Sequence, residues 1–167
     1  MKNIILLCAL VSAAIFPGCA HTTTEEEQKV TQLVERQKVE DVVNKLFIET
    51  DQRHWREVAK LFSDQVNLDM SSLSRQPASV ETPKQIINGW EKGLSPVQAI
   101  QHQTSNFLTE ISGTNAKVFC YGTATHYKNP AFRENVASIV GSYDVHLVKV
   151  GDTWKIDSMK FNKKYVE

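Results

Sequence analysis

The chain has little cysteine, no net charge and no internal repeat. Lys plus Arg and Asp plus Glu each number 19, so the formal charge is zero. Nucleic-acid-binding proteins usually carry a basic excess, so nucleic acid is not an expected partner. No similarity recurs at the repeat lengths typical of solenoids. Of the 167 residues, 41% are apolar and 23% are charged, which is a globular composition at the length of one domain.

Only one cysteine falls inside the predicted domain. The three cysteines are Cys8, Cys19 and Cys120, and the first two belong to the N-terminal segment. A disulfide within the domain is therefore excluded, and the domain must depend on its hydrophobic core for stability. We expect Cys120 to be a small apolar core residue.

The longest uncharged apolar run lies at the N-terminus. It follows Lys2 and covers residues 4–16, which is typical of a signal peptide and too short to span a bilayer. The sequence Phe16-Pro17-Gly18-Cys19 resembles a bacterial lipobox, in which the cysteine is lipidated. These features predict a signal peptide over 1–19 with lipidation of Cys19, a tether over 20–28 and one domain over 29–167.

Two processing routes lead to two locations. Lipidation of Cys19 would anchor the protein in a membrane on the periplasmic side of the bacterial cell envelope. Ala20 after the cysteine resembles the lipoproteins that are sorted to the outer membrane. The alternative is ordinary cleavage after Ala20, which would give a soluble periplasmic or secreted protein.

Helical patterns dominate the first half of the domain and strand patterns the second. Apolar spacing predicts helices over about 25–50, 55–62 and 83–93, with N-terminal caps at Thr24 and Thr82. Alternation predicts strands over about 66–70, 99–111, 116–127, 135–150 and 153–162, with a loop over 71–81. Helices followed by an antiparallel meander indicate an α+β fold, whose concave sheet face should close over the long helix.

Asp51 is a candidate for a functional core position. It follows Phe47 by four residues, and Phe47 follows Val43 by four, so its carboxylate continues an apolar stripe. The alternative is that Asp51 caps the second helix. His102 and His126 also have structural alternatives, because His102 could be a hydrogen-bonded core or surface histidine and His126 could be solvated near a strand end.

Several short motifs follow one another in an order that is found in one family. They are Thr50-Asp51-x-x-His54-Trp55, Leu61-Phe62-Ser63-Asp64, Gln101-His102-Gln103, Gly141-Ser142-Tyr143-Asp144 and Gly151-Asp152-Thr153-Trp154-Lys155-Ile156. Over Val30–Phe161 the chain thereby resembles the SnoaL-like family of the nuclear-transport-factor-2-like superfamily, in its scytalone-dehydratase-like branch. The resemblance implies a cone-shaped barrel, with three N-terminal helices packed on a curved, mainly antiparallel sheet around a pocket. It also implies a homodimer through the exposed sheet face.

Asp51, His102 and His126 fall on the catalytic positions of that branch. The resemblance implies that Asp51 orients His126, that His102 moves a proton, and that neither a metal nor a cofactor takes part. Histidine suits proton transfer near neutral pH. Two tyrosines that polarise a carbonyl in the branch are replaced here by Thr50 and Met70. Two histidines and a carboxylate could instead bind a metal as a facial triad, an alternative that the resemblance does not favour.

A pocket is expected above the strand that carries His126, because the residues on its side of the strand are small. The predicted walls are Phe47, Met70, Trp90, Asn106, Leu108, Cys120, Ala124 and Tyr143. Apolar walls with a few polar groups are typical of small-molecule sites. They predict a small, apolar, oxygenated ligand and a cofactor-free dehydratase or isomerase. The alternatives are a ligand-binding or accessory envelope lipoprotein without catalysis, and a partner-binding module.

Overall fold

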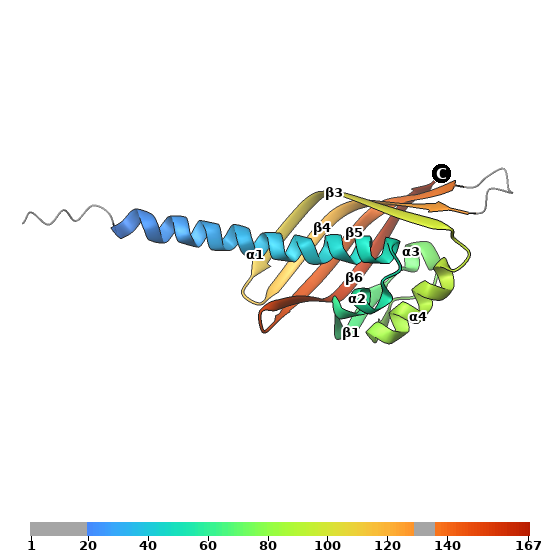
Figure 1. Cartoon of the computed structure of the whole chain (residues 1–167), viewed down its shortest axis with the longest axis horizontal. Coiled ribbons are helices and arrows are strands. Elements are labelled where there is room, and N and C mark those ends of the chain that lie inside the picture. Colours follow the sequence, from blue (N-terminus) through green and yellow to red (C-terminus); the bar gives the residue numbers. More distant parts are fainter. Residues whose placement is uncertain (1–19, 129–135) are drawn as a thin grey trace, which may run out of the picture. The chain divides into compact units, whose positions relative to one another are not determined.

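The computed structural model describes residues 20–128 and 136–167 (Figure 1). Its elements are α1 (Ala20–Asp51), α2 (Trp55–Lys60), β1 (Phe62–Asp69), α3 (Ser71–Ser74), β2 (Ser79–Glu81), α4 (Pro83–Leu94), β3 (Ala99–Ser112), β4 (Asn115–Tyr127), β5 (Val136–Val150) and β6 (Thr153–Val166). The chain divides into two compact units, Met1–Leu33 and Val34–Glu167. The sheet and the candidate site belong to the second unit. The predicted signal peptide and Cys19 lie outside the described residues.

The described part of the first unit is helical. Because α1 begins at Ala20, residues 20–28, expected as a tether, are helical, and the helix starts before the predicted Glu25. The end of this stretch, Glu25-Glu26-Glu27-Gln28, consists of residue types with high helix propensity. Val30 and Leu33 are largely exposed there. Within residues 20–128 and 136–167, no helix combines the length and the apolar character needed to cross a membrane.

Six strands form one curved sheet in the order β2-β1-β6-β5-β4-β3. Every neighbouring pair is antiparallel except β1 and β6, which are parallel, so the sheet is mixed. The predicted meander from β3 to β6 is confirmed. Its tight turns contain Gly113 and Gly151 at φ values of 59° and 60°, a left-handed conformation that favours glycine.

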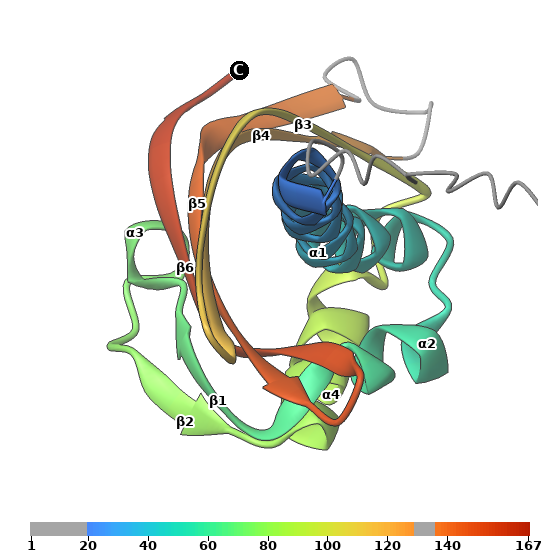
Figure 2. The ribbon, with the colours of Figure 1, turned by 90° about the vertical axis from the view of Figure 1, so that its left-hand side faces the viewer.

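The helices α2 and α4 lie on the concave side of the sheet, and from Val34 onwards α1 runs along that face (Figure 2). The predicted α+β fold is confirmed. The sheet is open rather than a closed barrel, because β2 and β3 are unpaired at its two edges. The strand β2 has only three residues and pairs with β1 alone, so it does not pair with β3 to close a barrel. The helices close the concave side in its place.

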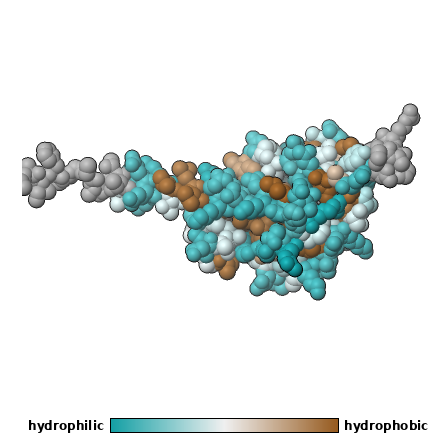
Figure 3. Space-filling view, in the orientation of Figure 1, coloured by the Kyte–Doolittle hydropathy of each residue, from teal (hydrophilic) through white to brown (hydrophobic). Residues whose placement is uncertain are grey.

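The core lies between α1 and the concave face. On α1, Val39, Val43 and Leu46 are fully buried, and they belong to one cluster with residues of the inner sheet face: Val118, Cys120, Tyr143, Val145, Leu147, Ile156, Met159 and Phe161. The face of this unit seen in Figure 3 is mainly hydrophilic, with scattered apolar residues. Burial of these apolar side chains between α1 and the sheet stabilises this unit.

A polar network fixes α1 on the sheet at the edge of this core. The Glu35 carboxylate accepts hydrogen bonds from Lys149 Nζ at 2.7 Å and from Trp154 Nε1 at 3.1 Å. The hydrogen bond from Lys149, with a second from Lys38, lowers the pKa of Glu35 to about 2. These contacts join α1 to β5 and β6.

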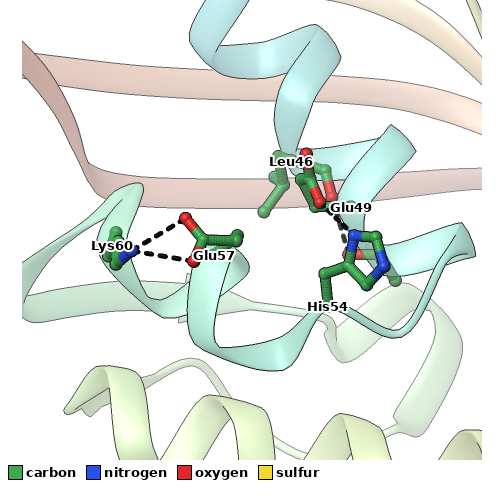
Figure 4. A network of polar contacts seen from close by, with 6 residues as sticks. Leu46, Glu49, His54, Glu57 and Lys60 are labelled. Carbon is green, nitrogen blue, oxygen red and sulfur yellow. Dashed lines mark hydrogen bonds and ion pairs between the residues drawn. The ribbon is translucent and has the colours of Figure 1, made fainter.

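A sharp corner ends α1 at Asp51. Arg53 adopts a left-handed φ of 57°, and the His54 backbone N–H donates to the Glu49 carbonyl at 2.9 Å. The His54 ring also lies against Glu49, with 2.7 Å between Nδ1 and Oε2 (Figure 4). His54 is exposed, and its contacts hold the corner that follows Asp51.

Some element boundaries differ from the predicted ones. The helix α2 stops at Lys60 because Phe62 already belongs to β1, whose predicted start was Val66. The short elements α3 and β2 lie in the predicted loop. The start of α4 is as predicted, with Thr82 and Gln85 forming a capping box and Pro83 in the first turn.

Candidate functional site

A cavity of about 380 Å³ lies between α1, α4 and the concave face of the sheet. Its lining is mostly apolar and comprises Phe47, Thr50, Met70, Leu73, Ser74, Gly89, Trp90, Gly93, Leu94, His102, Ala124, His126, Ile139, Tyr143, Met159 and Phe161. The described surface also has wider depressions of about 480 to 590 Å³, but neither His102 nor His126 lines them. Because two histidines converge in the apolar cavity of about 380 Å³, this cavity is the candidate site.

Asp51 and His102 form a hydrogen-bonded pair at this cavity. Asp51 Oδ1 lies 2.6 Å from His102 Nδ1, and Asp51 Oδ2 accepts the His102 backbone N–H at 2.8 Å. The two side chains are only 13% and 12% exposed. The end of α1 is thereby fixed to β3. The carboxylate holds the ring in one orientation and favours the tautomer protonated at Nδ1, which leaves Nε2 as a proton acceptor.

His126 lies on the same side of the sheet, one strand further in. It lines the cavity from β4, and no described residue hydrogen-bonds to its ring. Burial lowers the pKa of His126, and the neighbouring His102 and Lys128 lower it further. The His126 ring is therefore uncharged near neutral pH.

The expected partner of Asp51 was wrong, because Asp51 orients His102 rather than His126. The reason lies in the strand order. Since β3 is an edge strand, its backbone N–H groups that point away from β4 need other acceptors. The Asp51 carboxylate accepts one such N–H, that of His102, and its other oxygen contacts the ring of the same residue. His126, on β4, is further from that edge.

Aromatic rings form one wall of the cavity. The ring centroid of Phe47 lies 5.1 Å from that of His102 and 4.7 Å from that of Tyr143, and Tyr143 in turn lies 4.8 Å from Phe161. Thr50 and Met70, which replace the two tyrosines of the resembled pattern, both line the cavity. The Thr50 hydroxyl donates to the Leu46 carbonyl at 2.7 Å and is therefore already engaged within α1.

Five of the predicted wall residues line the cavity: Phe47, Met70, Trp90, Ala124 and Tyr143. The other three lie elsewhere. Cys120 is fully buried in the core below the cavity, where burial raises the pKa of its thiol to about 12. Asn106 is exposed with a φ of 56° at a bulge, and Leu108 is 66% exposed.

Of the wall contributed by α3 and α4, sequence reasoning found only Trp90. Leu73 and Ser74 come from α3, which lies in the predicted loop. Gly89 and Gly93 come from α4, and their four-residue spacing places them on one helix face. Two glycines at that spacing beside Trp90 were the available signal that this face of α4 leaves room for a ligand.

The donor set does not suggest a metal. Among the described residues, no three His, Cys, Asp or Glu side chains are arranged to hold a metal ion. Both Asp51 oxygens already accept hydrogen bonds from His102. What the arrangement offers chemically is a carboxylate-supported imidazole next to an uncharged imidazole in an apolar cavity.

The open, curved α+β sheet with its helices on the concave face is a fold of the nuclear-transport-factor-2-like type. The SnoaL-like domain matches residues 31–160, and the chain belongs to that family. No protein with a curated description matches it in sequence.

Solved structures share this fold at low identity. The Kfla4162 protein of Kribbella flavida is 16% identical with a TM-score of 0.78, covering 81% of this chain and 95% of its own. A protein of Novosphingobium aromaticivorans proposed to be a scytalone dehydratase is 21% identical with a TM-score of 0.72, covering 83% and 90%. A hexachlorocyclohexane dehydrochlorinase of Novosphingobium barchaimii is 13% identical with a TM-score of 0.70, covering 83% and 92%. At these identities the likeness establishes the fold.

Proposed function

We propose that the domain binds a small, uncharged, largely apolar oxygenated molecule and catalyses a cofactor-independent elimination or isomerisation that begins with proton removal by His102. The Asp51–His102 pair at the cavity carries this proposal, with 2.6 Å between Oδ1 and Nδ1. A buried carboxylate on Nδ1 orients the ring and stabilises the imidazolium that forms during proton transfer. The names of the two neighbours given as a dehydratase and a dehydrochlorinase also describe eliminations.

For a dehydration, the balance of atoms is simple. His102 Nε2 takes a proton from a carbon that lies next to a carbonyl. The electron pair of the broken C–H bond forms a C=C bond, and the C–O bond on the adjacent carbon breaks with its pair on oxygen. That oxygen takes the proton back from His102 Nε2 and leaves as water. Asp51 stays ionised throughout and holds the ring.

The lining of the cavity supports an uncharged ligand. With His126 neutral, none of the lining residues beside His102 carries a formal charge. A phosphate or carboxylate ligand would find no Lys or Arg side chain in this lining, and burial of an unpaired charge is costly. The uncharged His126 remains free to hydrogen-bond to the departing hydroxyl group.

The test uses a substrate that reports its own dehydration. Loss of water from 3-hydroxy-1-tetralone gives 1-naphthol, which fluoresces. We expect His102→Ala to lower the rate of naphthol formation by about 10²–10⁴-fold. The matched control is His146→Ala, because His146 also pairs with an aspartate, Asp157, at 2.6 Å but does not line the cavity. Unchanged turnover in His102→Ala would contradict the proposal.

Non-catalytic binding is the second candidate function. The observation that favours it is the replacement of the two tyrosines of the resembled pattern by Thr50 and Met70 in the cavity wall. In that case the tetralone would bind to the wild-type protein and be recovered unchanged. The same assay thus separates the two functions.

We also propose that the protein is exported and anchored through a lipid on Cys19. The support is the charged start at Lys2, the apolar run over 4–16 and the Gly18-Cys19 pair. In a Gram-negative host, wild-type protein should fractionate with the outer membrane and incorporate labelled palmitate. Cys19→Ala should lose the label, and a label retained in that variant would contradict the anchor.

A further inference from the structure

The mouth of the cavity is bordered by α3 and α4. Four of the lining residues are exposed to solvent, and all four come from these two helices: Leu73, Ser74, Gly89 and Gly93. The other lining residues are buried or half-buried. A residue that lines a cavity and is also exposed lies at its rim, so a ligand enters past α3 and α4.

Hydrogen bonds hold both rim elements in place. The Ser72 hydroxyl of α3 donates to the Phe161 carbonyl at 2.5 Å and accepts the Lys163 backbone N–H at 3.0 Å, and both partners belong to β6. Arg53, at the corner after α1, donates to the Leu94 carbonyl at the end of α4 at 3.1 Å. Because the backbone of each helix is held, the side chains on the rim set the width of the mouth.

Four of the six glycines in the described residues are required by the chain itself. Gly113 and Gly151 lie in turns and have positive φ, which other residues rarely adopt. A Cβ atom at Gly122 or Gly141 would come too close to an aromatic ring of the core. Each of these glycines therefore has a structural reason that does not involve a ligand.

Gly89 and Gly93 have neither of these reasons. Their φ angles are not positive, and a Cβ atom at either position would meet no atom of the described chain within 4 Å. Glycine is also the least favourable residue in a helix after proline. What the two glycines provide is open space, because their four-residue spacing places them on the face of α4 that borders the cavity.

The interior behind the mouth has room for more than one ring. An apolar cavity of about 150 Å³ is enough to hold benzene, and this cavity has a volume of about 380 Å³. The rings of Phe47, Tyr143 and Phe161 follow one another along its wall, and flat rings pack favourably against aromatic rings. The volume and the wall therefore suit a flat ligand of two fused rings, whose entry depends on a wide mouth.

We propose that Gly89 and Gly93 are specificity-determining residues, which hold the mouth open for a flat, uncharged ligand with two fused rings. The proposal rests on the proposed function only for the uncharged and apolar character of the ligand. A ligand crosses the mouth both when it enters and when it leaves. Narrowing the mouth should therefore lower the association and dissociation rate constants together, while their ratio, the dissociation constant, changes little.

The test compares the binding of 2-naphthol, which has two fused rings, with that of phenol, which has one. The full chain is used at one detergent concentration, so that partition into micelles affects all variants equally. The emission of 2-naphthol changes when it leaves water, so stopped-flow fluorescence gives its rate constants, and NMR line shapes give those of phenol.

The combined change Gly89→Val and Gly93→Val should lower both rate constants for 2-naphthol by about 10-fold or more. The dissociation constant of 2-naphthol should stay within about threefold, and the rate constants of phenol within about twofold. Leu73→Ala, which shortens a side chain on the α3 part of the rim, should raise both rate constants for 2-naphthol.

The matched control is Glu91→Val. Glu91 lies on α4 between the two glycines, is exposed and does not line the cavity. This variant introduces the same side chain into the same helix and should keep the wild-type rate constants for both ligands. Slowing of 2-naphthol by Glu91→Val would attribute the effect to the helix rather than to the mouth, against the proposal.

Stability provides a measurement that needs no ligand. Gly89→Ala should raise the Tm by about 1–4 °C, because alanine favours the helix and its Cβ atom has open space. A lower Tm in this variant would show that the chain itself requires glycine at this position, which contradicts the reasoning from open space.

An association rate constant for 2-naphthol that the combined variant leaves unchanged would overturn the proposal. Equal slowing of 2-naphthol and phenol, or no binding of 2-naphthol to the wild type, would also overturn it. The proposed function fails separately. If the combined variant slows 2-naphthol as expected but the wild type does not dehydrate 3-hydroxy-1-tetralone, the catalysis is refuted and the role of the glycines stands. Dehydration that depends on His102, with unchanged binding rates in the combined variant, would refute the role of the glycines alone.

Discussion

Two histidine–aspartate pairs lie on opposite faces of one sheet, and the distance from ring nitrogen to carboxylate is the same in both. His102 and Asp51, on the concave side, and His146 and Asp157, on the outer side, both have 2.6 Å between Nδ1 and Oδ1. The first pair is 12% and 13% exposed, and both members of the second are 31% exposed. Only the first adjoins the cavity. The same contact therefore forms with and without a cavity beside it, so the surroundings of the pair, rather than the pair itself, distinguish the candidate site.

The two faces differ most in their contribution to stability. Leu147 is fully buried on the inner face, and Leu108 is 66% exposed. Leu147→Ala should lower the free energy of unfolding by about 2–5 kcal/mol, because it removes buried apolar atoms and leaves a cavity. Leu108→Ala should change it by about 0.5 kcal/mol or less. Urea denaturation measures both, and equal losses would contradict the assignment of the core face.

The next prediction separates the two pairs by catalysis. Asp51→Asn should lower tetralone dehydration by about 10²-fold or more, because the amide can hold the ring in the wrong tautomer and cannot stabilise the imidazolium. Asp157→Asn should leave the rate within about twofold, since surface substitutions away from the site are mild. An equal loss of rate in Asp51→Asn and Asp157→Asn would contradict the assignment of catalysis to the pair at the cavity.

The smallest expected effect concerns pH. Burial lowers the pKa of His126 in the folded protein below its unfolded value. The unfolded state therefore binds the proton more readily, and stability is lost as the pH falls below about 6.5 towards the folded pKa. His126→Gln should flatten this part of the stability curve. Thermal melts between pH 5 and 8 provide the check, and a wild-type slope retained in His126→Gln would contradict it.

Local periodicity predicted much of this site. The spacing of Val43, Phe47 and Asp51 on α1 indicated an inward carboxylate, and strand alternation on β4 placed Ala124 and His126 on one face. These features depend on one element at a time. The partner of Asp51 could not be predicted in this way, because it depends on β3 being the edge of the sheet, and strand order is a property of the whole fold.

The misplacement of Asn106 and Leu108 has a local cause that the sequence hides. Pairing of β3 with β4 shifts between Ser105 and Leu108, where an extra residue bulges out at Asn106. A bulge reverses which side chains face inward. Leu108 therefore pairs with Phe119 on the outer face, and Phe107 packs against the core instead. No glycine marks this bulge, so alternation alone placed the residues beyond it on the wrong side.

The contact of Asp51 with His102 joins positions that are 51 residues apart in the sequence. Neither half can form the pair until β3 has docked beside the end of α1, and closing so long a segment is slow compared with forming a helix. The Asp51–His102 pair therefore forms only when the whole domain has folded. If the chain is exported unfolded, as we propose, the Asp51–His102 pair is absent while the chain crosses the membrane. The proposed activity then begins only after the domain has folded on the far side.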